Sequence, residues 1–179
     1  MSGESLRRLL AVLVLALGVA AAGLGMLRGW RARGHRQSGL PAPVAAPATL
    51  GEPVSTLAGT YVSTTLAGQF LDRVVAHGLG PRATAVLAVH PAGLVLSRDG
   101  SEPMFIRAAE VVGIGDSAGM VGKVVGRPEL LLVRWRAGDT LLDTGFRPCA
   151  RADRDQIPAL AARITETLGV PPDRRQEVA

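Results

Sequence analysis

The sequence predicts a mainly β domain that is closed by one C-terminal helix and preceded by a single membrane-spanning helix. Three observations lead to this fold class. They are an uncharged apolar run near the N-terminus, short apolar runs broken by glycine and proline in the middle, and apolar residues at helical spacing near the end. The expected order is a short N-terminal segment at 1–8, a transmembrane helix at 9–27, a basic flank and linker at 28–58, the β domain with its helix at 59–170, and a flexible tail at 171–179.

The predicted transmembrane helix runs from Leu9 to Leu27, which are nineteen residues without a charged or polar side chain. At ~1.5 Å per residue such a helix covers about 28 Å, close to the ~30 Å hydrocarbon core of a bilayer. Two arginines precede it and four follow it: Arg7, Arg8, Arg28, Arg31, Arg33 and Arg36. Because the more basic end stays in the cytoplasm, we expect a single-pass cell-membrane protein with a cytoplasmic C-terminal domain.

Two alternatives to this topology remain open. The run could be a cleaved signal peptide, with Ala20-Ala21-Ala22 as the cleavage site, although four arginines just after that site oppose translocation. The domain could also be exported and lie outside the cytoplasm. Residues 37–58, which hold four prolines and almost no charge, are expected to form an extended, unpacked spacer before the domain.

The β prediction starts at Thr60, where short runs rich in Val, Leu and Ile, including "TYVST" and "FLDRVVAH", alternate with turn residues every 8–12 positions. The runs "TAVLAV" and "GLVLS" are joined by His90-Pro91-Ala92, which predicts a hairpin. The runs "LLLVRW" and "TLLDTGF" are joined by a turn at Arg136–Asp139. This spacing of apolar runs and turns predicts about seven strands in a small sandwich or barrel.

The predicted C-terminal helix has one apolar stripe, made of Ile157, Leu160, Ala161, Ile164 and Leu168. Asp153 or Asp155 is expected to cap its start, with Pro158 in the first turn. Gly169, followed by Pro171, marks its end.

Charge and composition exclude some partners. The net charge of +5 comes from residues 1–40, which hold six arginines and one acidic residue, whereas residues 52–170 hold twelve residues of each sign. A neutral body with 3% aromatic residues has neither the basic surface nor the stacking platforms of a nucleic-acid-binding protein. The single cysteine, Cys149, cannot form an intramolecular disulfide, which fits a reducing compartment.

Asp143-Thr144-Gly145, preceded by two leucines, matches the way an aspartic protease presents its catalytic aspartate. Such an enzyme needs two aspartates that share a proton, and this chain has one such triplet with only 34 residues after it. We therefore expect a strand that ends in a turn, with Asp143 accepting backbone hydrogen bonds. A hydrolase that uses Asp143 is kept as the minor alternative.

Other candidate catalytic or ligand motifs are weaker. Asp72 and His77, with Ser63 or Cys149 as nucleophile, have no supporting local context. The stretch "GIGDSAGMVGKVVG" lacks P-loop spacing because Val124 follows Lys123, and three histidines in the whole chain make no metal cluster. We therefore predict no catalytic residue, no cofactor and no metal site.

The stretches "GTYVSTTLAGQFLDRVVAHGLG", "AGMVGKVV" and "LLDTGFRP", behind one span and a Pro/Ala linker, resemble small actinobacterial membrane proteins with a bacterial PH-like domain. The resemblance implies a PH-like fold of two packed antiparallel sheets with a C-terminal helix. Members are often labelled "membrane protein" or "transporter" and are often encoded beside pyrimidine-biosynthesis genes. A single span without polar residues cannot enclose a transport pathway.

These observations predict a membrane-anchored, non-enzymatic PH-like module for binding or scaffolding at the cytoplasmic face. Its neutral body favours a protein partner over anionic lipid, since lipid attraction needs basic residues near the surface. The candidate binding-surface residues are Arg73, His77, Lys123 and Arg127.

Overall fold

The computed structural model describes residues 3–36, 39–47, 49–120, 123–124 and 129–170. The chain forms two compact units, Met1–Gly39 and Leu40–Ala179. The first unit holds one helix, α1 (Gly3–Arg36), in which every described side chain from Val12 to Met26 is exposed. The second unit is the β domain.

Within the part of α1 whose side chains are described, and in the other described helices, none is both long enough and apolar enough to cross a membrane. The structure therefore does not support the transmembrane helix predicted at Leu9–Leu27, and membrane attachment stays a proposal.

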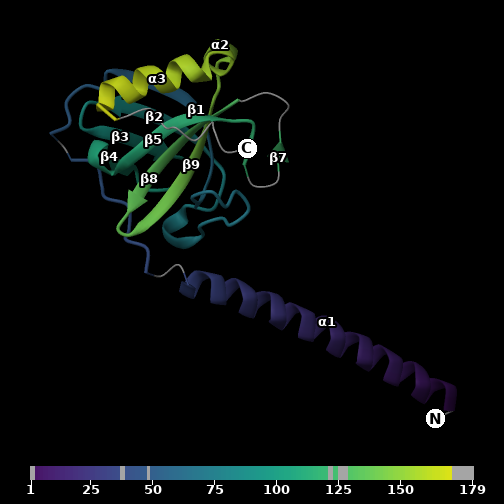
Figure 1. Ribbon diagram of the computed structural model, residues 1–179. Helices are drawn as coiled ribbons and strands as arrows, with labels where there is room; N and C mark the ends of the chain where they lie inside the picture. Colours follow the sequence, from purple (N-terminus) through teal and green to yellow (C-terminus); the bar gives the residue numbers. More distant parts are fainter. Residues whose placement is uncertain (1–2, 37–38, 48, 121–122, 125–128, 171–179) are drawn as a thin grey trace. The chain divides into compact units, whose positions relative to one another are not determined.

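The β domain contains one seven-stranded antiparallel sheet in the order β4-β3-β2-β1-β9-β8-β5, together with a small hairpin, β6–β7 (Figure 1). This confirms a mainly β fold of about seven main strands. The elements are β1 (Ser55–Leu66), η1 (Ala76–Gly78), β2 (Ala83–His90), β3 (Gly93–Arg98), β4 (Met104–Arg107), η2 (Ala108–Glu110), β5 (Val111–Ser117), β6 (Gly119–Met120), β7 (Lys123–Val124), β8 (Leu130–Ala137), β9 (Thr140–Pro148), α2 (Arg151–Asp155) and α3 (Ile157–Leu168).

The strands form one continuous sheet rather than the two packed sheets that the resemblance implied. The reason is β1, whose twelve residues serve both halves: Ser55–Tyr61 pairs with β2, and Gly59–Leu66 pairs with β9. The register with β9 shifts between Tyr61 and Ser63, and a bulge of this kind bends a strand and increases its twist. One long bent strand thus replaces a break between two sheets.

Both predicted hairpins are present. In the β2–β3 hairpin, Ala85 lies opposite Arg98 and His90 lies opposite Gly93. In the β8–β9 hairpin, the last pair before the turn is Ala137 opposite Thr140. The β8–β9 turn is therefore only Gly138-Asp139, with Gly138 at φ +59°, as a two-residue hairpin turn requires. The apolar run "FLDRVVAH", in contrast, is no strand, and belongs to the long loop between β1 and β2.

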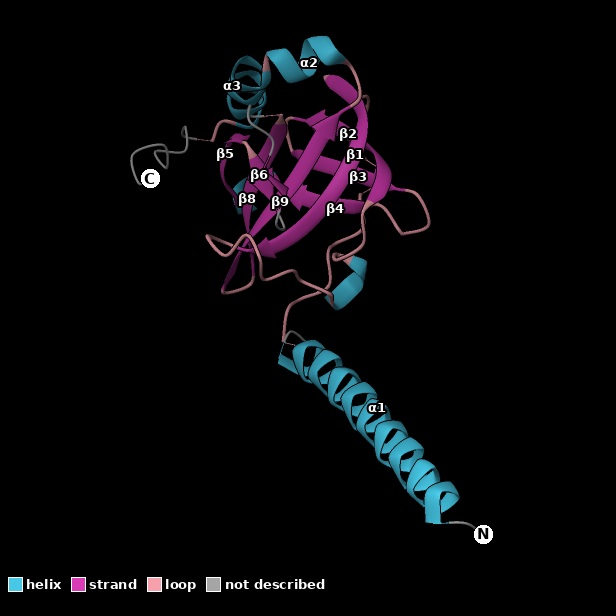
Figure 2. Cartoon of the chain, turned by 90° about the vertical axis from the view of Figure 1, so that its right-hand side faces the viewer, coloured by secondary structure: helices cyan, strands magenta, loops and turns pink. Residues whose placement is uncertain are grey.

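The C-terminal helix α3 packs its predicted apolar stripe into the core and contacts β5, β2 and β8. Figure 2 shows α2 and α3 together over one end of the sheet. Pro158 lies in the first turn and Gly169 ends the helix at φ +64°, as predicted. The predicted aspartate cap is wrong, because Gln156 is the N-cap and makes no side-chain hydrogen bond there. Asp153 and Asp155 belong instead to the short additional helix α2.

The predicted spacer also differs from the structure, because its first described part binds the domain. Leu40 is 7% exposed in the main core, and its carbonyl oxygen accepts a hydrogen bond from His77 Nε2 at 2.8 Å. Val44 forms an antiparallel bridge with Phe105 of the edge strand β4. We call residues 40–47 the strap.

The strap completes the protection of the β4 edge. Phe105 N donates to the Val44 carbonyl oxygen at 2.9 Å, on the outer side of β4. Because backbone N–H groups alternate in direction along a strand, the backbone nitrogens of Pro103 and Arg107 point to the same outer side. Pro103 has no N–H, and Arg107 N donates to Glu110 Oε2 at 3.2 Å. The outward N–H groups of this edge are therefore all used or missing, which disfavours pairing with another chain.

Candidate functional site

The three sequence stretches that carry the resemblance meet on the central strands of the sheet. They are Gly59–Gly80, Ala118–Val125 and Leu141–Pro148, and Val121, Gly122 and Val125 lie outside the described residues. Met120 packs in a small apolar cluster with Leu130, Leu132 and Val62. A Cβ on Gly145 would lie 2.6 Å from Met120 Sδ, so the glycine of the Asp-Thr-Gly triplet makes room for this methionine.

Asp143 forms a buried ion pair with Arg134 on the neighbouring strand. Arg134 Nε donates to Oδ1 at 2.6 Å and Nη2 donates to Oδ2 at 2.7 Å, while Gly68 N donates to Oδ2 at 3.0 Å. Asp143 is fully buried and Arg134 is 15% exposed. The bond from Gly68 confirms that Asp143 accepts a backbone hydrogen bond. The predicted strand end is wrong, because Asp143-Thr144-Gly145 lies in the middle of β9 and pairs with both neighbouring strands. The bidentate pairing with Arg134 leaves the carboxylate unsuited to share a proton with a second aspartate.

The other face of the same strands carries a buried chain of hydroxyl groups. Trp135 Nε1 donates to Thr144 Oγ1 at 2.9 Å, and Thr144 Oγ1 lies 2.8 Å from Thr64 Oγ1. Thr64 Oγ1 lies 2.7 Å from the hydroxyl of Tyr61, which also donates to the carbonyl oxygen of Leu79. Burial raises the pKa of Tyr61 to about 12 despite the opposing Thr64 hydrogen bond and the charges of Arg98 and Arg73. The tyrosine is therefore a neutral donor at physiological pH.

The β1–β2 loop, residues 67–82, folds back along β1. Thr64 N donates to Leu79 O at 3.0 Å, Val74 N donates to Thr64 O at 2.8 Å, and Ser63 Oγ donates to Gly80 O at 3.2 Å. Val74 and Leu79 are buried in the core. These bonds hold a long loop in one conformation, which is what a binding surface on a loop requires.

The tip of this loop exposes two large apolar side chains. Phe70 is 42% exposed and Leu71 is 79% exposed. The backbone around them is held by hydrogen bonds from Gln69 N to Leu66 O and from Asp72 N to Gln69 O, both 2.9 Å long. The sequence offered only a weak signal for this tip, because "FLDRVVAH" is one of the short apolar runs that indicate strands.

The four candidate binding-surface residues are placed only in part. Arg73 and His77 lie exposed on the β1–β2 loop, and His77 Nε2 is bonded to the strap. Lys123 belongs to β7, with its side chain outside the description, and Arg127 lies outside the described residues altogether. The shared surface of these four residues therefore stays a prediction.

The structure gives no support to the second hydrolase hypothesis, in which Asp72, His77 and Ser63 act together. The His77 ring is bonded to a backbone carbonyl, and Ser63 Oγ donates to the carbonyl oxygens of Gly80 and Thr64. Cys149, the other candidate nucleophile, is exposed. Within the described residues there is also no group of three or more His, Cys, Asp or Glu side chains that could hold a metal ion.

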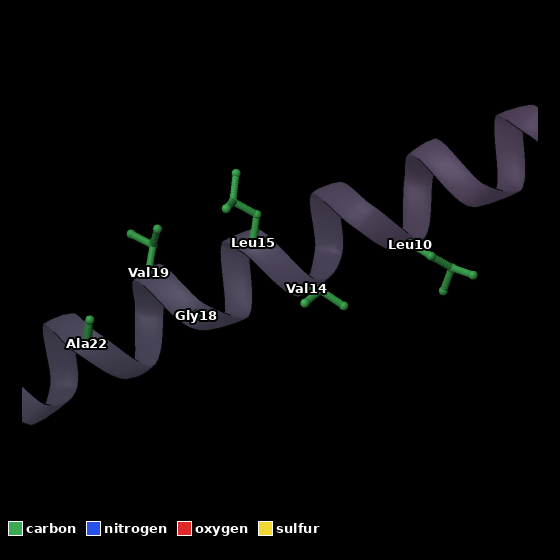
Figure 3. A pocket seen from close by; sticks show the side chains of 6 residues that line it. All are labelled: Leu10, Val14, Leu15, Gly18, Val19 and Ala22. Atoms are coloured by element: carbon green, nitrogen blue, oxygen red, sulfur yellow. The ribbon is translucent and has the colours of Figure 1, made fainter.

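One hollow lies on α1 and is lined by Leu10, Val14, Leu15, Gly18, Val19 and Ala22. Figure 3 shows these as side chains along a single helix, with Gly18 adding none. No lining residue has a polar side chain, so this surface offers no chemistry for catalysis or for binding a polar ligand. Of the flanking arginines, Arg7 is exposed, and the side chains of the other five lie outside the description.

A family model described as "Bacterial PH domain-like" matches residues 39–164, a range that begins next to the buried Leu40. No curated protein matches the chain. A solved structure titled "The 8S snRNP Assembly Intermediate" is 12% identical, with a TM-score of 0.47, and the match covers 77% of this chain and 97% of that one. Another, the C-terminal domain of an unknown protein from Leishmania infantum, is 15% identical, with a TM-score of 0.39, over 80% and 98% of the two chains.

The two solved structures are too distant to bear on function. The match to the family model confirms the PH-like part of the resemblance. The comparisons give no support for a membrane span, an actinobacterial source or a gene neighbourhood.

Proposed function

Because the chain belongs to the bacterial PH domain-like family, we propose that it is a non-enzymatic binding module that contacts a protein partner through the tip of its β1–β2 loop. The observation that carries the proposal is the exposure of Phe70 and Leu71 on a loop whose backbone is held by hydrogen bonds. A backbone that is already held in place loses little entropy on binding, and aromatic residues are enriched in the cores of protein interfaces.

The charge of the loop supports a protein partner rather than anionic lipid. Residues 67–82 hold two arginines, Arg73 and Arg82, and one carboxylate, Asp72. Attraction to an anionic membrane supplies about 1 kcal/mol per basic residue near the surface, so this loop gains little from such lipids. An apolar tip with balanced charge is better suited to an apolar patch on a protein.

We also propose that α1 holds the module at the inner face of the cytoplasmic membrane. The support comes from the sequence: nineteen residues without a charge, followed by four arginines and preceded by two. In intact cells, a C-terminal reporter should then be protected from added protease. Cleavage of the reporter in intact cells would favour the exported alternative instead. Replacing Arg28, Arg31, Arg33 and Arg36 with serine should loosen or invert the topology.

A photo-activated cross-linking residue at position 71 tests the protein partner in cells that express the full chain. We expect one discrete adduct, which should weaken strongly in the Phe70→Ser variant. The control carries the cross-linker at Val112, which is 39% exposed on β5 and far from the loop in sequence. Equal adducts at both positions, or none at position 71, would contradict the proposal. Salt-sensitive binding to anionic vesicles that depends on Phe70 would indicate a lipid partner instead.

A further inference from the structure

Arg98, the last residue of β3, carries a buried positive charge that the domain uses only in part. The residue is 7% exposed, and Nη1 donates to the carbonyl oxygen of Gly78 at 2.6 Å. Its Nε is buried and has no hydrogen-bond partner. An arginine side chain has five N–H donors in a planar fork, and buried donors are nearly always paired.

The charge of Arg98 also has no counter-ion in the part of the chain that the structure describes. Among the described residues no carboxylate lies within 4.0 Å of its guanidinium. The group stacks over the ring of Tyr61, with Cζ 5.0 Å from the ring centroid. Burial keeps Tyr61 neutral, since its pKa is raised to about 12, and the charge of Arg73 acts on the same ring. The environment of this ring is therefore positive, whereas buried charges are usually paired with an opposite charge.

The backbone carbonyl that Arg98 binds belongs to η1 of the β1–β2 loop. None of the three residues of η1 is buried, and His77 and Gly78 are exposed. His77 has φ +53° and Gly78 has φ +67°, and the left-handed region is unfavourable for a histidine. The hydrogen bonds of His77 to Leu40 and of Arg98 to Gly78 hold η1, rather than fully buried side chains, so η1 is the segment that an entering anion would displace.

We propose that Arg98 binds an oxyanion, a carboxylate or phosphate group, that enters beneath η1 and pairs with the fork through Nε. Carboxylates and phosphates match the geometry of the guanidinium fork and supply the charge that the domain lacks at this point. The site is separate from the tip of the β1–β2 loop, so the proposal does not depend on Phe70 or Leu71 contacting a partner.

The chain has one tyrosine, which makes the test selective. The full-length protein is labelled with 13C in the tyrosine ring, and its single ring signal is followed while phosphate or acetate replaces chloride at constant ionic strength. We expect a saturable shift that depends on the anion. Stronger binding of phosphate would indicate a phosphate-bearing ligand, and stronger binding of acetate a carboxylate.

Variants then separate the site from general salt effects. Arg98→Met should weaken the anion at least tenfold, while Arg82→Met, at an exposed arginine near the end of the same loop, should leave the affinity within twofold. Arg98→Lys keeps the charge and removes the fork, so it should give an intermediate affinity, and it replaces the methionine variant if that one does not fold. No saturable shift with either anion, or an unchanged shift in the Arg98 variants, would overturn the proposal.

Discussion

Replacing Asp143 with asparagine should destabilise the β domain by about 3 kcal/mol. The fully buried carboxylate accepts two hydrogen bonds from Arg134 and one from Gly68. Asparagine keeps the shape but turns an amide NH₂ or a single neutral oxygen toward the guanidinium, so at least one charge-assisted bond of about 1.5–3 kcal/mol is lost. Breaking a buried ion pair on one side costs about 3–5 kcal/mol because the remaining charge is uncompensated. Since Arg134 is 15% exposed, water relieves part of this cost, which favours the lower end of that range.

Urea unfolding of the full chain, followed by tryptophan fluorescence, measures this loss. With a urea dependence of about 1.5 kcal/mol per M, the midpoint should fall by about 2 M. Asp155→Asn is the matched control, because Asp155 forms an ion pair of 3.7 Å in which both side chains are mostly exposed; it should change stability by less than about 0.5 kcal/mol. Replacing both buried partners, Asp143→Leu with Arg134→Met, should recover most of the lost stability.

A loss below about 1 kcal/mol in Asp143→Asn would refute this reasoning, since it would mean that the ion pair is not integral to the fold. A variant that kept full stability but lost a hydrolytic activity of the wild-type protein would revive the enzyme hypothesis.

Three further predictions concern packing, pH and the strap. Gly59→Ala should destabilise the domain by about 2–3 kcal/mol in the same unfolding assay, because the added Cβ would lie 2.4 Å from Phe146 Cζ and 2.5 Å from the Arg147 backbone oxygen. The control is Gly115→Ala, whose Cβ would have no atom within 4 Å and which should change stability by less than about 0.5 kcal/mol. Tyr61 should ionise near pH 12 in the folded protein and near pH 10 when unfolded. Because the pKa of Tyr61 is raised in the folded protein, stability is intact below pH 10 and falls by about 2–3 kcal/mol toward pH 12. Absorbance titration of the single tyrosine measures the pKa in the folded protein. A Tyr61→Phe variant that lost the same stability between about pH 10 and 12 would contradict the assignment. Leu40→Ala should cost about 2 kcal/mol if the strap belongs to the domain, against less than about 0.5 kcal/mol for Val54→Ala at a 63% exposed position; equal effects would mean that the strap contributes nothing.

Much of the secondary structure could be predicted because it follows from local patterns. The alternating runs of β2 and β3 bury mainly one face, whereas β8 and β9 are buried on both faces along most of their length. The spacing of apolar residues in α3 places them all on its buried side. Gly169 ends α3 because a left-handed residue is needed there and glycine adopts that conformation without a Cβ penalty. These features depend on neighbours within a few residues.

The sequence could have predicted the ion pair between Arg134 and Asp143, but the predicted β8–β9 turn was two residues too long. A four-residue turn at Arg136–Asp139 pairs Trp135 with Thr140 and places Arg134 opposite Leu141. The observed two-residue turn pairs Ala137 with Thr140, which brings Arg134 opposite Asp143. A register change of two residues keeps every side chain on its predicted face but changes its partner, so periodicity alone could not distinguish the two.

The sequence by itself determined the strand-rich middle of the chain, the stripe of α3 and the absence of excess positive charge in the body. Only the tertiary structure decided that Leu40 belongs to the core, that the β1–β2 loop presents Phe70 and Leu71, and that Arg98 lies buried beneath η1. These features join residues that are 20 or more positions apart, such as His77 with Leu40 and Arg98 with Gly78. Local propensity cannot specify such pairs, because their formation depends on the closure of long loops by the packing of the whole domain.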